Sequence, residues 1–143
     1  NSILDEIKPI DGAEDLIHSL HLKGIKTVIL SGGIKYLAVK WAKKWNMSEA
    51  LANDLIDGED GNLTAIINSS GHNKGPVMEK MIEKYNCEKN EIAAVGDTIV
   101  DVPTFERAGL SIAVNTDDER VISKANYHLK GDLTELQRLI INW

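Results

Sequence analysis

Short strand-like runs alternate with amphipathic helical segments along this chain, and the alternation limits the possible folds more than any other feature. Runs at 25–31, 91–96 and 110–115 are rich in valine, isoleucine, leucine and alanine, as buried strands are. Segments 34–45 and 73–86 carry apolar residues at helical spacing. Because parallel strands need crossover connections, usually helices, the pattern predicts an α/β fold with a mostly parallel sheet covered on both faces.

The overall composition fits one globular domain over residues 1–143. Apolar residues make up 43% and charged residues 27%, and no run approaches the roughly 18 apolar residues of a membrane span. A net charge of −6 disfavours nonspecific binding to nucleic acid or to an anionic membrane. Cys87 is the one cysteine of the sequence, which excludes an intrachain disulfide and indicates a reduced, cytoplasmic protein.

The segment between residues 50 and 70 departs from the alternation. Two short extended runs flank Gly58 and Gly61, and this pattern predicts a β-hairpin excursion at about 52–67. The sequence contains no internal repeat, linker or low-complexity tract, so the hairpin is interpreted as an excursion from a single domain.

Polar or glycine-rich stretches follow three of the predicted strands. They are Ser31-Gly32-Gly33, Gly96-Asp97 and Asn115-Thr116-Asp117. In open parallel sheets, ligands bind beyond the carboxyl ends of the strands. We therefore expect the three stretches to converge on one site.

Asp97 and Asp101 lie four positions apart, directly behind the apolar run that ends at Gly96. Two carboxylates held close together repel each other unless a cation neutralises them, and a small cluster of hard oxygen ligands suits Mg²⁺. The alternative is that Asp97 caps the following helix and Asp101 is a solvated acid of its first turn. The spacing alone leaves both interpretations open.

Ser31 is followed by Gly32 and Gly33 at the expected junction of a strand and a helix. A hydroxyl and free backbone N–H groups there can bind phosphate oxygens, although the same tripeptide also serves as a helix cap. Lys74 precedes a glycine-proline pair at a predicted helix start, where the helix dipole disfavours a cation. The lysine therefore either meets an anionic partner or extends into solvent.

In their order and separation, these elements resemble the haloacid dehalogenase (HAD) superfamily of phosphohydrolases. The pattern is Ser-Gly-Gly after a strand, a lysine about forty residues later, and Gly-Asp-x-x-x-Asp about twenty residues beyond it. The stretches "VILSGGIKYLAVKWAKKWNM", "ANDLIDGEDGNLTAIIN" and "NKGPVMEKMI" look most like the phosphoserine phosphatase branch. The resemblance runs from about Ile10 to the C terminus and implies a Rossmann-like (HAD-like) three-layer sandwich.

The resemblance also implies a Mg²⁺-dependent phosphatase that hydrolyses a small phosphorylated metabolite. In this family an aspartate attacks phosphorus, and water then hydrolyses the aspartyl-phosphate, with Mg²⁺ bridging the nucleophile and the phosphate. Carried onto this chain, the Ser31-Gly-Gly turn would bind the phosphoryl oxygens, and Lys74 would neutralise charge on the nucleophile and the phosphoryl group. Asp97 would ligate Mg²⁺ directly, and Asp101 would complete the metal site by orienting a metal-bound water or Lys74.

The family's Asp-x-Asp-x-Thr/Val nucleophile motif is absent from the sequence, since "DGEDG" at 57–61 lies in the predicted hairpin. In this fold the nucleophile strand lies between the strands that end at Ser31 and Asp97. We therefore expect the central strand, the nucleophile and a cap to come from an N-terminal segment of a longer protein or from a separate chain. Open edges beside such a gap could drive association into a homo-oligomer.

Two further residues depart from the pattern of the branch. Val100 stands where relatives often carry Asn or Thr, which implies a lost contact to the phosphate or the lysine. Pro103 in "VDVP" resembles the phosphorylation domain of P-type ATPases, although Ser31-Gly-Gly replaces the Thr-Gly-Asp of that branch.

Three alternatives to a phosphatase therefore stay open. They are a noncatalytic phosphate- or metal-binding family member, a P-type ATPase-like phosphorylation domain, and a flavodoxin-like ligand-binding domain. Because the cap reads the substrate in this family, phosphoserine is only the first substrate to test.

Overall fold

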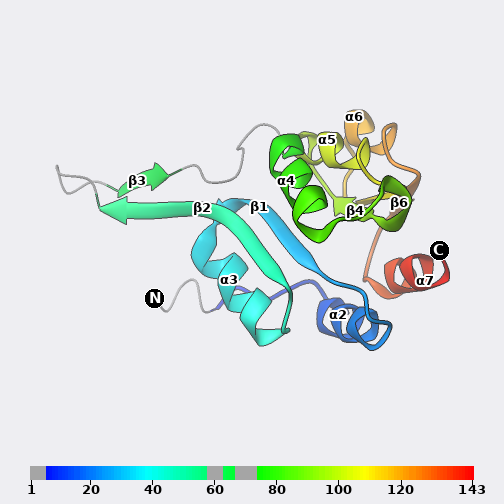
Figure 1. Ribbon diagram of the computed structural model, residues 1–143, viewed down its shortest axis with the longest axis horizontal. Helices are drawn as coiled ribbons and strands as arrows, with labels where there is room; N and C mark the ends of the chain where they lie inside the picture. Colours follow the sequence, from blue (N-terminus) through cyan, green and yellow to red (C-terminus); the bar gives the residue numbers. More distant parts are fainter. Residues whose placement is uncertain (1–5, 58–62, 67–73) are drawn as a thin grey trace. The chain divides into compact units, whose positions relative to one another are not determined.

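The computed structural model describes residues 6–57, 63–66 and 74–143 of the chain. These residues fall into two compact units, each considered by itself. The first unit comprises Asn1–Ser69 and Asp132–Gln137, and the second comprises Ser70–Gly131 and Arg138–Trp143. Figure 1 shows the helices and strands of both units in their order along the chain.

The first unit contains a three-stranded sheet in the order β1-β2-β3. Strand β1 (Val28–Ile34) pairs in parallel with the first part of β2 (Glu49–Asp57), and the last part of β2 pairs antiparallel with β3 (Leu63–Ile66). Helix α3 (Lys35–Lys44) packs against β1 and β2 through its buried alanines, and helix α2 (Ala13–Leu22) precedes β1. One long strand, β2, therefore belongs both to a parallel pair and to an antiparallel pair.

The antiparallel pair formed by β2 and β3 lies in the range for which the sequence predicts a β-hairpin. The turn predicted around Gly58 and Gly61, and residue 67 at the end of the predicted range, lie outside the described residues. The first strand of the pair already begins at Glu49, because its opening residues form the parallel ladder with β1.

The Ser-Gly-Gly stretch lies inside β1, and in this respect the predicted end of the strand at Ser31 is wrong. The strand continues to Ile34, and α3 begins at the next residue. The register of the β1–β2 ladder shifts between Leu30 and Ile34, so the glycine pair forms an irregular last part of the strand. The Gly33 N–H donates to Ser31 Oγ at 3.0 Å, a local side-chain bond that competes with regular ladder pairing.

The second unit is built on a parallel sheet in the order β4-β5-β6. Strand β5 (Leu110–Val114) lies between β4 (Ala93–Gly96) and β6 (Tyr127–Leu129), and all of its residues are buried. A strand with neighbours on both sides and covered faces needs a continuous apolar run, which LSIAV nearly supplies. The remaining elements are α4 (Gly75–Tyr85), η1 (Lys89–Glu91), η2 (Ile99–Asp101), α5 (Val102–Phe105) and α6 (Glu119–Ile122), with α7 (Thr134–Asn142) contributing to both units.

The predicted α/β class with parallel strands is confirmed. The described strands form two sheets where the sequence predicts one, and within the described residues β1 pairs only with β2, and β4 only with β5. The sequence predicts an additional central strand between β1 and β4, and that strand stays a prediction. Among the described helices, none is both long enough and apolar enough to span a membrane.

A side-chain hydrogen-bond pair ties β5 to the residue that precedes β6. Asn126 Oδ1 accepts from the Ser111 N–H at 2.8 Å and lies 3.0 Å from Ser111 Oγ, which also accepts from the Asn126 N–H at 3.0 Å. Ser111 is only 3% exposed. Buried polar groups of a strand need such partners, so Asn126 lets a serine occupy the centre of the sheet.

We expect Asn126→Ala to lower the free energy of unfolding by about 1–3 kcal/mol, because the Ser111 N–H and hydroxyl lose their partner in the interior. Urea denaturation monitored by circular dichroism measures this change. Asn142→Ala, at the exposed end of α7, is the matched control and should leave the transition midpoint unchanged. Equal midpoints for the two variants would contradict the role given to Asn126.

Candidate active site

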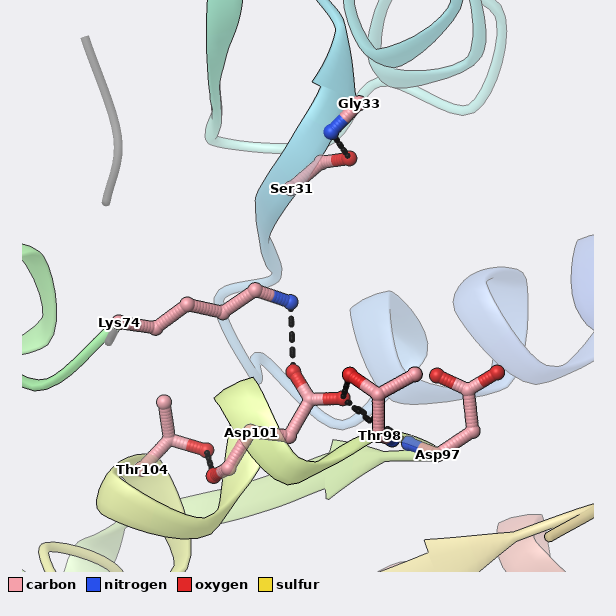
Figure 2. A network of polar contacts seen from close by, with 7 residues as sticks. All are labelled: Ser31, Gly33, Lys74, Asp97, Thr98, Asp101 and Thr104. Carbon is pink, nitrogen blue, oxygen red and sulfur yellow. Dashed lines mark hydrogen bonds and ion pairs between the residues drawn. The ribbon is translucent and has the colours of Figure 1, made fainter. Parts of the chain in front are cut away.

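An ion pair between Lys74 and Asp101 forms the centre of the candidate site in the second unit. Lys74 is the N-cap residue of α4, and Asp101 ends η2. Their Nζ and Oδ1 atoms lie 2.5 Å apart, and the side chains are only 12% and 6% exposed. Figure 2 shows the ammonium group directed at the carboxylate. The interpretations of Lys74 as a solvated lysine and of Asp101 as a solvated acid are therefore wrong.

The second oxygen of Asp101 organises the turn that follows β4. Oδ2 accepts hydrogen bonds from the backbone N–H groups of Asp97 and Thr98 at 3.0 and 3.1 Å, and Thr98 Oγ1 lies 3.3 Å away. Charge-assisted bonds of this kind are stronger than neutral ones. The carboxylate therefore holds the backbone at Asp97 while its other oxygen holds Lys74 (Figure 2).

Gly96 is required by the close approach of Asp101. A Cβ atom added at Gly96 would lie 2.4 Å from both Cβ and Cγ of Asp101, a distance that real Cβ atoms do not tolerate. The glycine in Gly-Asp-x-x-x-Asp thus leaves room for the second acid to fold back over the end of β4. Gly96, Asp97 and Asp101 therefore depend on one another: the glycine makes room for Asp101, and Asp101 binds the backbone of Asp97.

Val100 retains a contact to the lysine through its backbone. The Lys74 N–H donates to the Val100 carbonyl at 3.4 Å, so the start of α4 is tied to η2 beside Asp101. The expectation that valine loses a contact concerns its side chain, and this main-chain bond does not depend on the side chain.

Asp97 differs from Asp101 because its carboxylate is exposed at the carboxyl end of β4. The N-cap residue of η2 is Thr98, so the interpretation of Asp97 as the cap of the following helix is wrong. Among the residues that the structure describes, the Asp97 carboxylate has no hydrogen-bond or ion-pair partner, and no cluster of three or more metal-ligating side chains occurs. Mg²⁺ commonly takes one or two carboxylates and completes its shell with water and phosphate oxygens, so Asp97 fits one such ligand.

The two other stretches predicted to join the site are Ser31-Gly32-Gly33 and Asn115-Thr116-Asp117. Ser31, Gly32 and Gly33 belong to the first unit, so their convergence with Lys74 stays a prediction. The Asn115 side chain lies at the carboxyl end of β5, but it pairs with the backbone N–H and carbonyl of Gly131 at 2.8 and 3.1 Å.

The acids behind Asn115 are occupied by local contacts. Asp117 forms an ion pair with Lys130, whose ammonium group lowers the pKa of the Asp117 carboxyl below its usual value. The pKa of Asp118 is lowered by hydrogen bonds from Arg120, at the start of α6. These side chains therefore stabilise the loops after β5 and β6.

Two threonines near Asp101 were not singled out by the sequence analysis. Thr98 adds a hydroxyl beside Asp101 Oδ2, and buried Thr104 donates from Oγ1 to the Asp101 carbonyl at 2.6 Å. A threonine three residues after an acid in a helical turn is a pattern that could have indicated the second contact. The first contact depends on the fold of the turn and has no comparable signal.

Comparisons with known proteins identify the family of the chain. The family model of haloacid dehalogenase-like hydrolases matches residues 1–109. The chain is 33% identical over 116 residues to phosphoserine phosphatase from Archaeoglobus fulgidus, an alignment that covers 79% of this chain and 33% of that protein.

Two solved structures are also similar. A substrate-bound phosphoserine phosphatase complex matches with a TM-score of 0.87 and 30% identity, covering 96% of this chain and 67% of the other. A phospho-aspartyl intermediate analogue of phosphoserine phosphatase matches with a TM-score of 0.85 and 28% identity, covering the same shares of the two chains. The chain thus spans about a third of the length of the curated relative, and it belongs to the haloacid dehalogenase-like hydrolase family.

Proposed function

We propose that this chain forms part of a Mg²⁺-dependent phosphomonoester hydrolase of the phosphoserine phosphatase type. The observation that carries the proposal is the buried Lys74–Asp101 ion pair beside the exposed Asp97 carboxylate at the end of β4. An ammonium group held next to a free acid offers one partner for a phosphate and one for a cation. The similarity to phosphoserine phosphatases supports this class of substrate.

Lys74 acts by charge neutralisation in this proposal. Its ammonium group is preorganised by Asp101, so that it needs little rearrangement when negative charge develops on a phosphoryl group. Asp101 also fixes the backbone of Asp97 through Oδ2. The role of Asp101 is therefore to position Lys74 and the backbone of Asp97. Both of its carboxylate oxygens already have partners, which favours this role over direct ligation of a metal.

Phosphoryl transfer proceeds through two displacements in this proposal. A carboxylate oxygen of the nucleophilic aspartate forms a bond to phosphorus while the bond from phosphorus to the ester oxygen breaks, and the leaving oxygen takes up a proton. Water then attacks the aspartyl-phosphate, releasing inorganic phosphate and the free carboxylate. The similarity to a phospho-aspartyl intermediate analogue supports this route.

In this proposal the nucleophile comes from a further segment of the same protein or from a separate chain, since the family's nucleophile motif does not occur in these 143 residues. Ser31 and the Gly32 amide would bind the phosphoryl oxygens from the first unit. A Mg²⁺ ion held by Asp97 would neutralise charge on the phosphate. Asp97 is the one protein ligand that this proposal gives to the cation, so removing either the cation or the Asp97 carboxylate tests it.

We expect the full-length protein to hydrolyse O-phospho-L-serine with Mg²⁺ and to lose this activity in EDTA. Asp97→Asn should lower kcat by about 100-fold or more, the size typical of removing one preorganised charge-stabilising group. Release of inorganic phosphate measures both effects. Asp117→Asn is the matched control, because this exposed acid follows the neighbouring strand and pairs with Lys130. Equal turnover by the wild type and Asp97→Asn would overturn the role of Asp97.

A second experiment measures the contribution of the ion pair to stability. Asp101→Asn should lower the free energy of unfolding by about 3 kcal/mol, because it leaves the buried ammonium group without a counter-charge. Adding Lys74→Met should restore part of this loss, since the uncompensated charge is then removed. Urea denaturation of the two single variants and the double variant gives the coupling energy. Additive losses would contradict a coupled pair.

The absent nucleophile motif favours one other candidate, a noncatalytic family member that binds phosphate. Isothermal titration calorimetry with inorganic phosphate distinguishes the two. Binding that needs Lys74, together with no turnover of any phosphomonoester by the full-length protein, would identify the binding function.

A further inference from the structure

Arg107 connects α4, whose N-cap residue is Lys74, with the segment that carries Asp101. Its Nε and Nη2 atoms lie 2.9 and 2.8 Å from Oε1 of Glu79 on α4, and its Nη1 donates to the Pro103 carbonyl at 2.7 Å in α5. One guanidinium group therefore bridges α4 and α5, which also contact each other directly. Neither Arg107 nor Glu79 belongs to the residues assigned to the site.

The contact to Pro103 holds the Arg107 side chain against α5 independently of Glu79. Its bond to the Pro103 carbonyl and its 28% side-chain exposure restrict the guanidinium, whereas Glu79 is 62% exposed. A planar guanidinium with several donors suits such a bridge, because the contact to Pro103 leaves Nε and Nη2 facing the carboxylate. Arg107 is thus a fixed anchor to which α4 is attached.

The attachment of α4 matters because Lys74 lies at its first turn. Glu79 follows Lys74, the N-cap residue of α4, by five residues. The main-chain bond that ties this end of α4 to η2, from Lys74 N–H to Val100 O, is long at 3.4 Å. The ammonium group reaches Asp101 only while α4 keeps its place beside α5. Glu79 lies about one and a half helical turns along α4 from Lys74.

We propose that Arg107 is a positioning residue that keeps Lys74 against Asp101 by clamping α4 to α5 through Glu79. The functional consequence rests on the proposed function, in which Lys74 binds the phosphoryl group. The structural consequence does not, because a looser α4 exposes the Lys74 amine whether or not the protein is a phosphatase. The competing view is an ordinary surface ion pair without effect on Lys74.

The test measures the acetylation rate of Lys74 with an N-hydroxysuccinimide acetate reagent and peptide mass spectrometry. In Arg107→Ala and in Glu79→Ala we expect Lys74 to react about two- to fivefold faster, the factor that corresponds to losing one partly exposed ion pair. The double variant should show no further increase, since both residues belong to one clamp. Glu79→Gln, which keeps an acceptor oxygen for Arg107, should lie between the wild type and Glu79→Ala.

Two controls make the result specific to Lys74. Lys80 is exposed on the same helix, and its acetylation rate should stay constant in every variant. Arg120→Ala removes a comparable ion pair, with Asp118, and should leave Lys74 unchanged. An unchanged Lys74 rate in Arg107→Ala, or an equal rise at Lys80, would overturn the proposal. The acetylation measurement needs no substrate. A full-length protein without phosphatase activity would therefore count against the proposed function, while a faster acetylation of Lys74 in Arg107→Ala would still support the clamp.

Discussion

The buried carboxylate of Asp101 is the group on which the rest of the candidate site depends. An ionised carboxylate in the interior is strongly destabilising unless it is paired and hydrogen-bonded. Here Oδ1 meets the Lys74 ammonium group and Oδ2 accepts two backbone N–H groups from the turn after β4. The position of Lys74, the shape of the turn and the need for glycine at position 96 all follow from satisfying this one charge.

The same arrangement divides the charges of the site into two kinds. Lys74 and Asp101 neutralise each other and are shielded from solvent, so they stabilise the local fold as well as preparing the site. Asp97 remains exposed, and no partner for its carboxylate is found in the described part of the chain. A satisfied pair next to a free acid is the arrangement expected where a ligand brings the missing charges. Arg107 and Glu79 extend this preparation to the helix that carries Lys74.

Much of the second unit could be predicted from the sequence. The apolar run before Gly96 and the run LSIAV mark β4 and β5, because buried parallel strands need continuous apolar residues. The unfavourable place of Lys74 at a helix start left open an anionic partner or exposure to solvent, and the structure shows that Asp101 is its partner. The end of β1 was less predictable, since two glycines can continue an irregular strand as readily as they form a turn.

The sequence by itself determined the α/β class and the polar end of β4, because periodicity and spacing are properties of the linear chain. The order of Lys74, Asp97 and Asp101 along the chain also supplied the resemblance to the family. Only the tertiary structure decided that Asp101 is buried and paired while Asp97 is exposed, and that Thr98 and Thr104 contact Asp101. Identical side chains four positions apart differ in this way because burial and hydrogen bonding depend on neighbours from distant segments. Lys74 and Asp101 are 27 positions apart, and no local pattern encodes the contact between them.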